Sequence, residues 1–354
     1  MRWSDGLYFG VALSLVALAT ACAPAPAAPS TAAPANAKPV AESMDALYAA
    51  AKTEGQVALY STLNTTYSQP LIAKFAEQFP GVTVNHNRQL AEKLTEIMKQ
   101  EASAGKMTWD VVEGPEDAFF AWNQSKYLQA YVAGQAATYS NDRKDPAGMW
   151  VSDRVNPETV ALNSDLVKAD EMPKTWTDMT DPRWKGRLAV DGTNVLLYAA
   201  MKEAWGAQKA GDFLKGIAAN QPRLESSQAT IAQLLAAGEF GAAVGTYIDT
   251  PHALQQKGAP IKIIGADPVF VQLQLVGLGA QAPHPNAAKL FINWLLSDAG
   301  QTAMNEVGVV PAQPDKYKAA TEFLGAPNTV VISPELAAKA PDLTQEFNQI
   351  LGIK

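Results

Sequence analysis

Apolar and polar positions between residues 55 and 85 follow a pattern that predicts a strand, a helix and a second strand. Residues 57–60 form an apolar run with the length of a strand buried on both faces. Apolar side chains then recur at a helical period over residues 66–79, and residues 82–84 predict the next strand. In such a βαβ unit, ligands bind at the carboxyl end of the first strand. Here that position is a polar loop containing Ser61 and Thr62.

The same arrangement, a short apolar run followed by a polar loop and a helical pattern, recurs along the chain. Helix starts of this kind offer unpaired N–H groups and a partial positive charge, which favour anionic ligand groups. We therefore expect the loops to converge on one ligand site. The candidate ligand-binding residues are Ser61, Thr62, Arg88 and Glu113 in the first half and Thr193, Asn194, Ser226, Ser227 and Tyr247 in the second half.

Two of these candidates carry charge. Arg88 is the one guanidinium in the predicted loops, and it could hold a carboxylate or a phosphonate through two parallel hydrogen bonds. The alternative is a salt bridge at the surface or between lobes. Glu113 could meet a ligand amine or pair with Arg88. The hydroxyl and amide candidates are also explained by helix capping alone, so their functional role depends on their convergence.

The amino-terminal segment predicts export and anchoring. Residues 7–20 have the length of a signal-peptide hydrophobic region, which makes residues 1–21 a predicted signal peptide. Cys22 follows directly, in a setting similar to a lipobox, so we expect it to be acylated. The leucine is Leu18, one place earlier than in the usual motif, and ordinary secretion is the alternative. Residues 22–40 are rich in alanine and proline and predict a tether to the membrane.

Bulk composition narrows the function classes. The 354 residues carry a formal net charge of −7 and contain no run of basic residues, which argues against a nucleic-acid partner. Cys22 is the only cysteine, so neither a disulfide framework nor a thiolate metal site is expected. The three histidines are scattered and no catalytic motif is present. We expect a protein without a cofactor that is not an enzyme; an enzyme on the same scaffold is the distant alternative.

Four blocks of the sequence carry a family resemblance. They are residues 55–85, residues 160–163, residues 173–189 with the pattern Pro-x-x-Trp…Asp-Pro-x-Trp-Lys-Gly, and residues 282–297 with His-Pro-Asn-Ala-Ala-Lys-Leu-Phe. Together they resemble the extracellular solute-binding proteins of ABC importers, in the type II group that includes ferric-iron binders. In the third block, two tryptophans are expected to pack a turn against the sheet, without ligand contact.

The resemblance implies an α/β protein with a two-lobed type II periplasmic-binding-protein fold and two crossover hinge strands. On this basis lobe 1 comprises residues 41–160 and 275–354, and lobe 2 comprises residues 161–274. The protein would be a monomer outside the cytoplasm, in the periplasm or at the cell surface, anchored to the membrane by its lipid. It would capture a small solute between the lobes and deliver it to the permease subunits of an ABC importer.

The resemblance leaves two classes of ligand open. Ferric binders of this group hold the metal with adjacent tyrosines, whereas the matching loop here contains only Tyr247. Fe(III) is a hard cation that requires several anionic oxygens, so a lone tyrosine is weak support for it. We therefore expect a small anionic or zwitterionic solute that carries a carboxylate or phosphonate. Ferric iron, with Tyr247 as a ligand, is the alternative.

Overall fold

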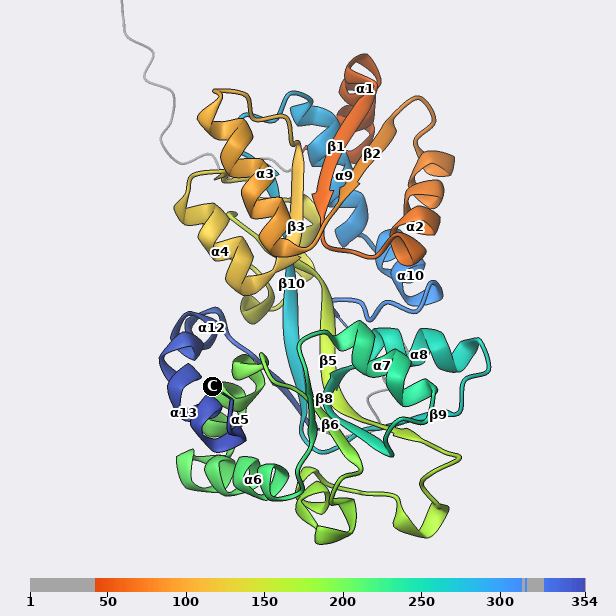
Figure 1. Ribbon diagram of the computed structural model, residues 1–354. Helices are drawn as coiled ribbons and strands as arrows, with labels where there is room; N and C mark the ends of the chain where they lie inside the picture. Colours follow the sequence, from red (N-terminus) through yellow and green to blue (C-terminus); the bar gives the residue numbers. More distant parts are fainter. Residues whose placement is uncertain (1–41, 314–315, 317–327, 354) are drawn as a thin grey trace, which may run out of the picture. The chain divides into compact units, whose positions relative to one another are not determined.

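The computed structural model describes residues 42–313, 316 and 328–353 (Figure 1). The predicted signal peptide, Cys22 and the tether lie outside the described residues and stay predictions. Within the described ranges, no helix is both long enough and apolar enough to cross a lipid bilayer.

The described strands form one mixed sheet, in which the predicted first βαβ unit is confirmed. In spatial order, the main path is β2 (Thr83–Arg88), β1 (Gln56–Ser61), β3 (Val111–Pro115), β10 (Val269–Gly279), β5 (Val151–Asn163), β8 (Ala242–Tyr247), β6 (Leu188–Asp191) and β7 (Arg223–Glu225). Off this path, β4 (Leu128–Gln129) and β11 (Thr329–Val331) pair with β10, and β9 (Ile261–Ile264) pairs with β5.

Two sets of parallel strands are joined by two long antiparallel strands. Strands β1, β2 and β3 are parallel and form the sheet of lobe 1, and β6, β7 and β8 are parallel and form the sheet of lobe 2. Strands β5 and β10 pair with each other and run from one set to the other (Figure 1). This confirms the predicted two-lobed α/β fold with two crossover strands. The first crossover begins at Val151, nine residues before the predicted hinge segment.

Helices cover both faces of the lobe 1 sheet. Val57 and Leu59 of β1 face one core cluster and Tyr60 faces another, as expected of alternate positions along a buried strand. The first face is covered by α1 (Met44–Glu54), α2 (Thr65–Gln78), α9 (Pro285–Leu296) and α10 (Asp298–Glu306). The second is covered by α3 (Ala91–Ser103) and α4 (Glu116–Gln124) (Figure 1).

Lobe 2 has the same layered construction. One face is covered by α5 (Val195–Trp205) and α6 (Ala207–Ala219), the other by α7 (Gln228–Ala236) and α8 (Asp249–Gln256). Trp176 and Trp184 are buried in the core between the sheet and helices α5 and α6, as predicted. Short 3₁₀ helices are η1 (Gly134–Thr138), η2 (Asn141–Arg143), η3 (Ala169–Glu171), η4 (Trp176–Thr180), η5 (Pro182–Trp184) and η7 (Ala340–Leu343).

The carboxyl-terminal helices correct one predicted boundary. Helices α12 (Pro334–Lys339) and α13 (Thr344–Leu351) pack against α5 and α6, and Ile332 and Phe347 lie in the same core cluster as Trp176. The expectation that residues 275–354 all belong to lobe 1 is wrong for this part. The physical reason is that β11 pairs in parallel with the first residues of β10, which lie in lobe 2, and thereby returns the chain there. We assign residues 328–353 to lobe 2.

Candidate functional site

Three predicted residues of lobe 1 meet at the carboxyl ends of adjacent strands. Ser61 is the register partner of Arg88 on β2 and of Glu113 on β3. The Ser61 hydroxyl donates to Glu113 Oε2 at 2.6 Å, and the same oxygen accepts the backbone N–H groups of Thr62 at 3.2 Å and Leu63 at 3.3 Å. Ser61 and Glu113 are both buried. These contacts fix the loop after β1.

The counter-ion of Glu113 comes from the first crossover strand. Arg154 Nη2 donates to Glu113 Oε1 at 2.9 Å and to Gln274 Oε1 at 3.3 Å, and Arg154 Nη1 donates to Asn156 Oδ1 at 2.8 Å. The side chains of the ion pair are only 6% and 3% exposed. The predicted alternative in which Glu113 pairs with Arg88 is therefore wrong. Glu113 holds the lobe 1 loops to the hinge through Arg154.

Arg88, unlike Arg154, has no carboxylate counter-ion among the described residues. It ends β2 and is half-buried. Its Nε is buried without a hydrogen-bond partner, and Arg88 makes no ion pair with any residue that the structure describes. The predicted alternative, a salt bridge of Arg88, is therefore not formed with any described residue. Anion binding by Arg88, the register partner of Ser61, stays a prediction.

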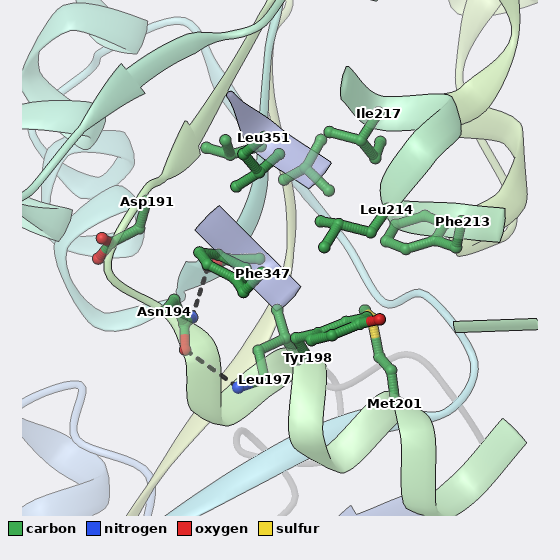
Figure 2. Close-up of a pocket in the computed structure, with 13 residues that line it drawn as sticks. Asp191, Asn194, Leu197, Tyr198, Met201, Phe213, Leu214, Ile217, Phe347 and Leu351 are labelled. Atoms are coloured by element: carbon green, nitrogen blue, oxygen red, sulfur yellow. Dashed lines mark hydrogen bonds between the residues drawn. The ribbon is translucent and has the colours of Figure 1, made fainter. Parts of the chain in front are cut away.

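The predicted residues before α5 act partly as caps. Asn194 Oδ1 accepts the N–H of Leu197 at 3.1 Å and so caps α5 (Figure 2). Its amide Nδ2 donates to Glu158 Oε2 and lies 3.5 Å from the carbonyl oxygen of Gly245. Thr193 is exposed, and its N–H and hydroxyl both donate to Asp191 Oδ1, at 2.8 and 2.6 Å. Asn194 is thus the member of this loop that contacts the hinge.

The serines before α7 are exposed. Ser227 caps that helix by accepting the N–H of Thr230 at 3.3 Å, and Ser226 precedes the cap residue. Gln228, the next residue, is the one that reaches the neighbouring strand end: its Oε1 accepts the Thr246 hydroxyl at 3.0 Å. For Ser226 and Ser227, ligand contact stays a prediction.

Tyr247 ends β8 opposite Glu158 of β5. Its hydroxyl donates to Gln272 Oε1 at 2.8 Å, which ties the lobe 2 loop to the second crossover strand. Burial raises the pKa of the Tyr247 phenol well above its usual value, and the nearby carboxylates Glu158 and Asp191 raise it further. The phenol is therefore held protonated, as a hydrogen-bonding group.

A polar face on the two crossover strands was missed by the sequence reasoning. Arg154 is the register partner of Gln274, and Asn156 is the register partner of Gln272. Glu158 continues the same alternation along β5. The signal was present, because Gln272 and Gln274 alternate in a β10 sequence that is otherwise apolar, and Arg154, Asn156 and Glu158 alternate along β5. The polar face connects the strand ends of the two lobes.

Two small pockets are lined in part by these residues. One, between α5, α6 and α13, is lined mainly by apolar side chains, with Asp191 and Asn194 at one side and Phe213 and Leu214 opposite (Figure 2). Its volume of about 40 Å³ compares with roughly 300–1,000 Å³ for small-molecule sites. The other, beside Ser61 and Glu113, measures about 20 Å³. Both have room for water rather than for an organic solute.

Among the residues that the structure describes, no group of three or more histidine, cysteine, aspartate or glutamate side chains is arranged to hold a metal ion.

Sequence comparison places the chain among solute-binding proteins. A family described as "Bacterial extracellular solute-binding protein" matches residues 70–324. "Iron uptake protein A1" of Synechocystis is 26% identical over 284 residues, 73% of this chain and 76% of the relative. A "Putative 2-aminoethylphosphonate-binding periplasmic protein" of Salmonella typhimurium is 29% identical over 184 residues, 46% of this chain and 53% of the relative. An uncharacterized protein of Haemophilus influenzae is 34% identical, but the match covers only 39% of its length.

Solved structures show the same fold. Iron-bound HitA from Pseudomonas aeruginosa matches with a TM-score of 0.67 at 19% identity, over 82% of this chain and 99% of that one. A substrate-binding protein of an ABC transporter from Agrobacterium tumefaciens matches with a TM-score of 0.72 at 16% identity, over 84% of this chain and 94% of that one. These likenesses confirm the predicted two-lobed periplasmic-binding-protein fold. The chain belongs to the bacterial extracellular solute-binding protein family.

Proposed function

We propose that the protein captures a small anionic or zwitterionic solute, with a carboxylate or phosphonate group, between its two lobes and delivers it to the permease of an ABC importer. The family supports the transport role. The observation that carries the choice of solute is Arg88, a half-buried guanidinium beside Ser61 with no ion pair among the described residues. The phosphonate-binding name of the Salmonella relative agrees with it.

The physical argument is the cost of an unsatisfied buried donor. A buried N–H group without an acceptor loses its hydration and gains nothing in exchange, at a cost of about 1–3 kcal/mol. A carboxylate or phosphonate would supply two parallel acceptors to a guanidinium. Ser61, which is held by Glu113, and the hinge residues Gln272 and Gln274 would add uncharged polar groups. From lobe 2, Asn194 and Tyr247 would contact the solute.

Ferric iron is the second candidate, and the name of the Synechocystis relative favours it. Iron would need phenolate and carboxylate oxygens. Tyr247 would be its tyrosine ligand, together with carboxylates such as Asp191 or with a bound anion held by Arg88. Against this, the hydroxyl of Tyr247 donates to Gln272, and the raised pKa of the phenol opposes formation of the phenolate.

Calorimetric titration of Arg88→Ala separates the candidates. With 2-aminoethylphosphonate as the probe, losing a buried charge partner costs about 2–5 kcal/mol, or roughly 30- to 4,000-fold in Kd. Tyr247→Phe should cost only about 0.5–1.5 kcal/mol. Arg183→Ala, in an exposed pair with Asp181, is the matched control and should bind like the wild type.

Iron predicts the reverse order, because phenylalanine cannot replace a phenolate ligand. A visible charge-transfer band that forms with ferric citrate and is lost in Tyr247→Phe would overturn the organic-anion proposal. Recovery of the probe chemically unchanged after incubation would also separate a binding protein from the distant alternative, an enzyme.

Anchoring through Cys22 completes the proposed function. A lipid on Cys22, followed by the tether of residues 22–40, would hold a monomeric binding protein at the membrane that carries the permease. Cys22→Ser should move the protein from the membrane fraction to the soluble fraction. A wild-type protein that is fully soluble, with an unmodified amino terminus after cleavage, would rule the anchor out.

A further inference from the structure

One buried carboxylate on the polar face of the crossover strands has no counter-ion. Glu158 of β5 is 0% exposed. Its Oε2 accepts the amide of Asn194, whereas its Oε1 is buried without a hydrogen-bond partner. No ion pair between described residues includes Glu158. The neighbouring charged group that acts on it is Asp191, which is also an acid.

The surroundings of Glu158 are acidic as well. Its register partner Tyr247 experiences the charges of Glu158, Asp191, Asp117 and Asp249, all of which are carboxylates. On the β10 side, the register partner of Glu158 is Phe270, which is apolar and buried. Among the described residues, the groups that contact or pair with Glu158 are an amide, a phenol and an aromatic ring, and the charged group that acts on it is an acid.

We propose that the solute carries an ammonium group and that Glu158 Oε1 is its acceptor, with Asn194 and Tyr247 beside it. This inference rests on the proposed function, and it narrows the solute from an anion to a zwitterion. The class is an aminoalkyl phosphonate or an amino acid.

The physical reason is charge compensation. Removing a carboxylate from water without a partner is costly, and burial accordingly raises the pKa of Glu158 to about 8. An ammonium group donates hydrogen bonds to the unpartnered oxygen and neutralises the buried charge. Asn194, which contacts this carboxylate, and Tyr247, its register partner, are both only half-buried. Movement of the lobe 2 loops would expose it to an incoming solute.

The first test compares two probes that differ in the amine alone. In calorimetric titrations of the wild-type protein, 2-aminoethylphosphonate should bind at least about 30-fold more tightly than ethylphosphonate, the factor expected for one buried charge partner. Equal affinity for the two probes would overturn the inference while leaving the proposed function intact. If neither probe binds, or if Arg88→Ala has no effect on binding, the proposed function itself fails.

The second test replaces the acceptor. Glu158→Gln keeps the shape and removes the charge, so the preference for the aminated probe should fall to within about threefold. Glu203→Gln, an exposed acid on α5, is the matched control and should keep the full preference. A Glu158→Gln protein that retains the full preference would assign the ammonium to another group and contradict the inference. Circular dichroism verifies that both variants are folded.

Discussion

Glu113, which binds Arg154 of the crossover strand β5, and Glu158, which lies on β5 itself, are two buried carboxylates that differ in their hydrogen-bond partners. Glu113 accepts a serine hydroxyl and two backbone N–H groups on one oxygen and the guanidinium of Arg154 on the other. Glu158 accepts one amide, and its second oxygen has no partner. Their exposures, 2% and 0%, are nearly the same.

The difference shows that burial alone does not decide what a charged residue does. Glu113 has donors for both oxygens and a counter-ion, so it acts as part of the framework that joins lobe 1 to the hinge. Glu158 lacks a counter-ion, so the protein holds it at a cost that a ligand could remove. Four changes test this comparison, in order of decreasing expected effect.

Arg154→Ala should have the largest effect. It leaves Glu113 buried without its counter-ion, and breaking a buried ion pair from one side destabilises a protein by about 3–5 kcal/mol. Urea unfolding followed by circular dichroism measures the change. Arg183→Ala, which removes an exposed ion pair, should cost at most about 1 kcal/mol. An Arg154→Ala protein no less stable than this control would show that Glu113 is not part of the framework.

Glu158→Gln should change how stability depends on pH. The pKa of Glu158 is raised from an ordinary 4.5 to about 8 in the folded protein, so the folded state binds the proton more tightly than the unfolded state. The stability this proton provides is complete below pH 4.5 and is lost as the pH rises toward 8. The free energy of unfolding of the wild type should therefore fall by about 3–4 kcal/mol between pH 5 and pH 8, and Glu158→Gln should not show this fall.

Urea unfolding at a series of pH values checks this sign. The wild type should lose more stability than Glu158→Gln as the pH rises, and Glu203→Gln should follow the wild type. Parallel curves for all three proteins would mean that Glu158 is compensated by a charge, and the contrast with Glu113 would then disappear.

The local part of this contrast was predictable from the sequence and the non-local part was not. Ser61 and Glu113 each follow an apolar run, Arg88 lies in the polar segment after the next one, and parallel strands bring such ends together. The pairing of Glu113 with Arg154 depends on the antiparallel register of β5 and β10, which shifts at Gln274 and Leu275. Nothing in a local window specifies that shift.

The position of the last helices shows the same limit. Their amphipathic pattern indicates that they pack on a core, but it does not say on which one. That choice is made by β11, whose three residues pair with the lobe 2 end of β10. Glu158, by contrast, could have been identified, because Arg154, Asn156 and Glu158 recur at every second position of one predicted strand.

Ser61→Ala should have an intermediate effect. The hydroxyl donates one of the hydrogen bonds to the ionised side chain of Glu113, and a bond to a charged group contributes about 1.5–3 kcal/mol. Because Thr62, Leu63 and Arg154 still contact Glu113, the loss should be smaller than that in Arg154→Ala. Urea unfolding of the two single variants and the double variant gives their coupling energy. A coupling near zero would indicate that the two donors do not act on the same carboxylate.

Tyr67→Phe should have the smallest effect, because it removes a neutral hydrogen bond. The Tyr67 hydroxyl, on α2 of lobe 1, donates to the backbone carbonyl of Asp249 at the start of α8 in lobe 2, at 2.9 Å. Such a bond contributes about 0.5–1.5 kcal/mol to the arrangement in which the lobes touch. If the solute binds that arrangement, its affinity should fall by about 2- to 13-fold.

Burial raises the pKa of the Tyr67 phenol, so this loss should be the same at pH 5 and pH 8, unlike the effect of Glu158→Gln. Calorimetric titration with 2-aminoethylphosphonate at both pH values measures the loss of affinity. A loss at only one pH value would show that Tyr67 acts through a titrating neighbour rather than through its hydrogen bond between the lobes.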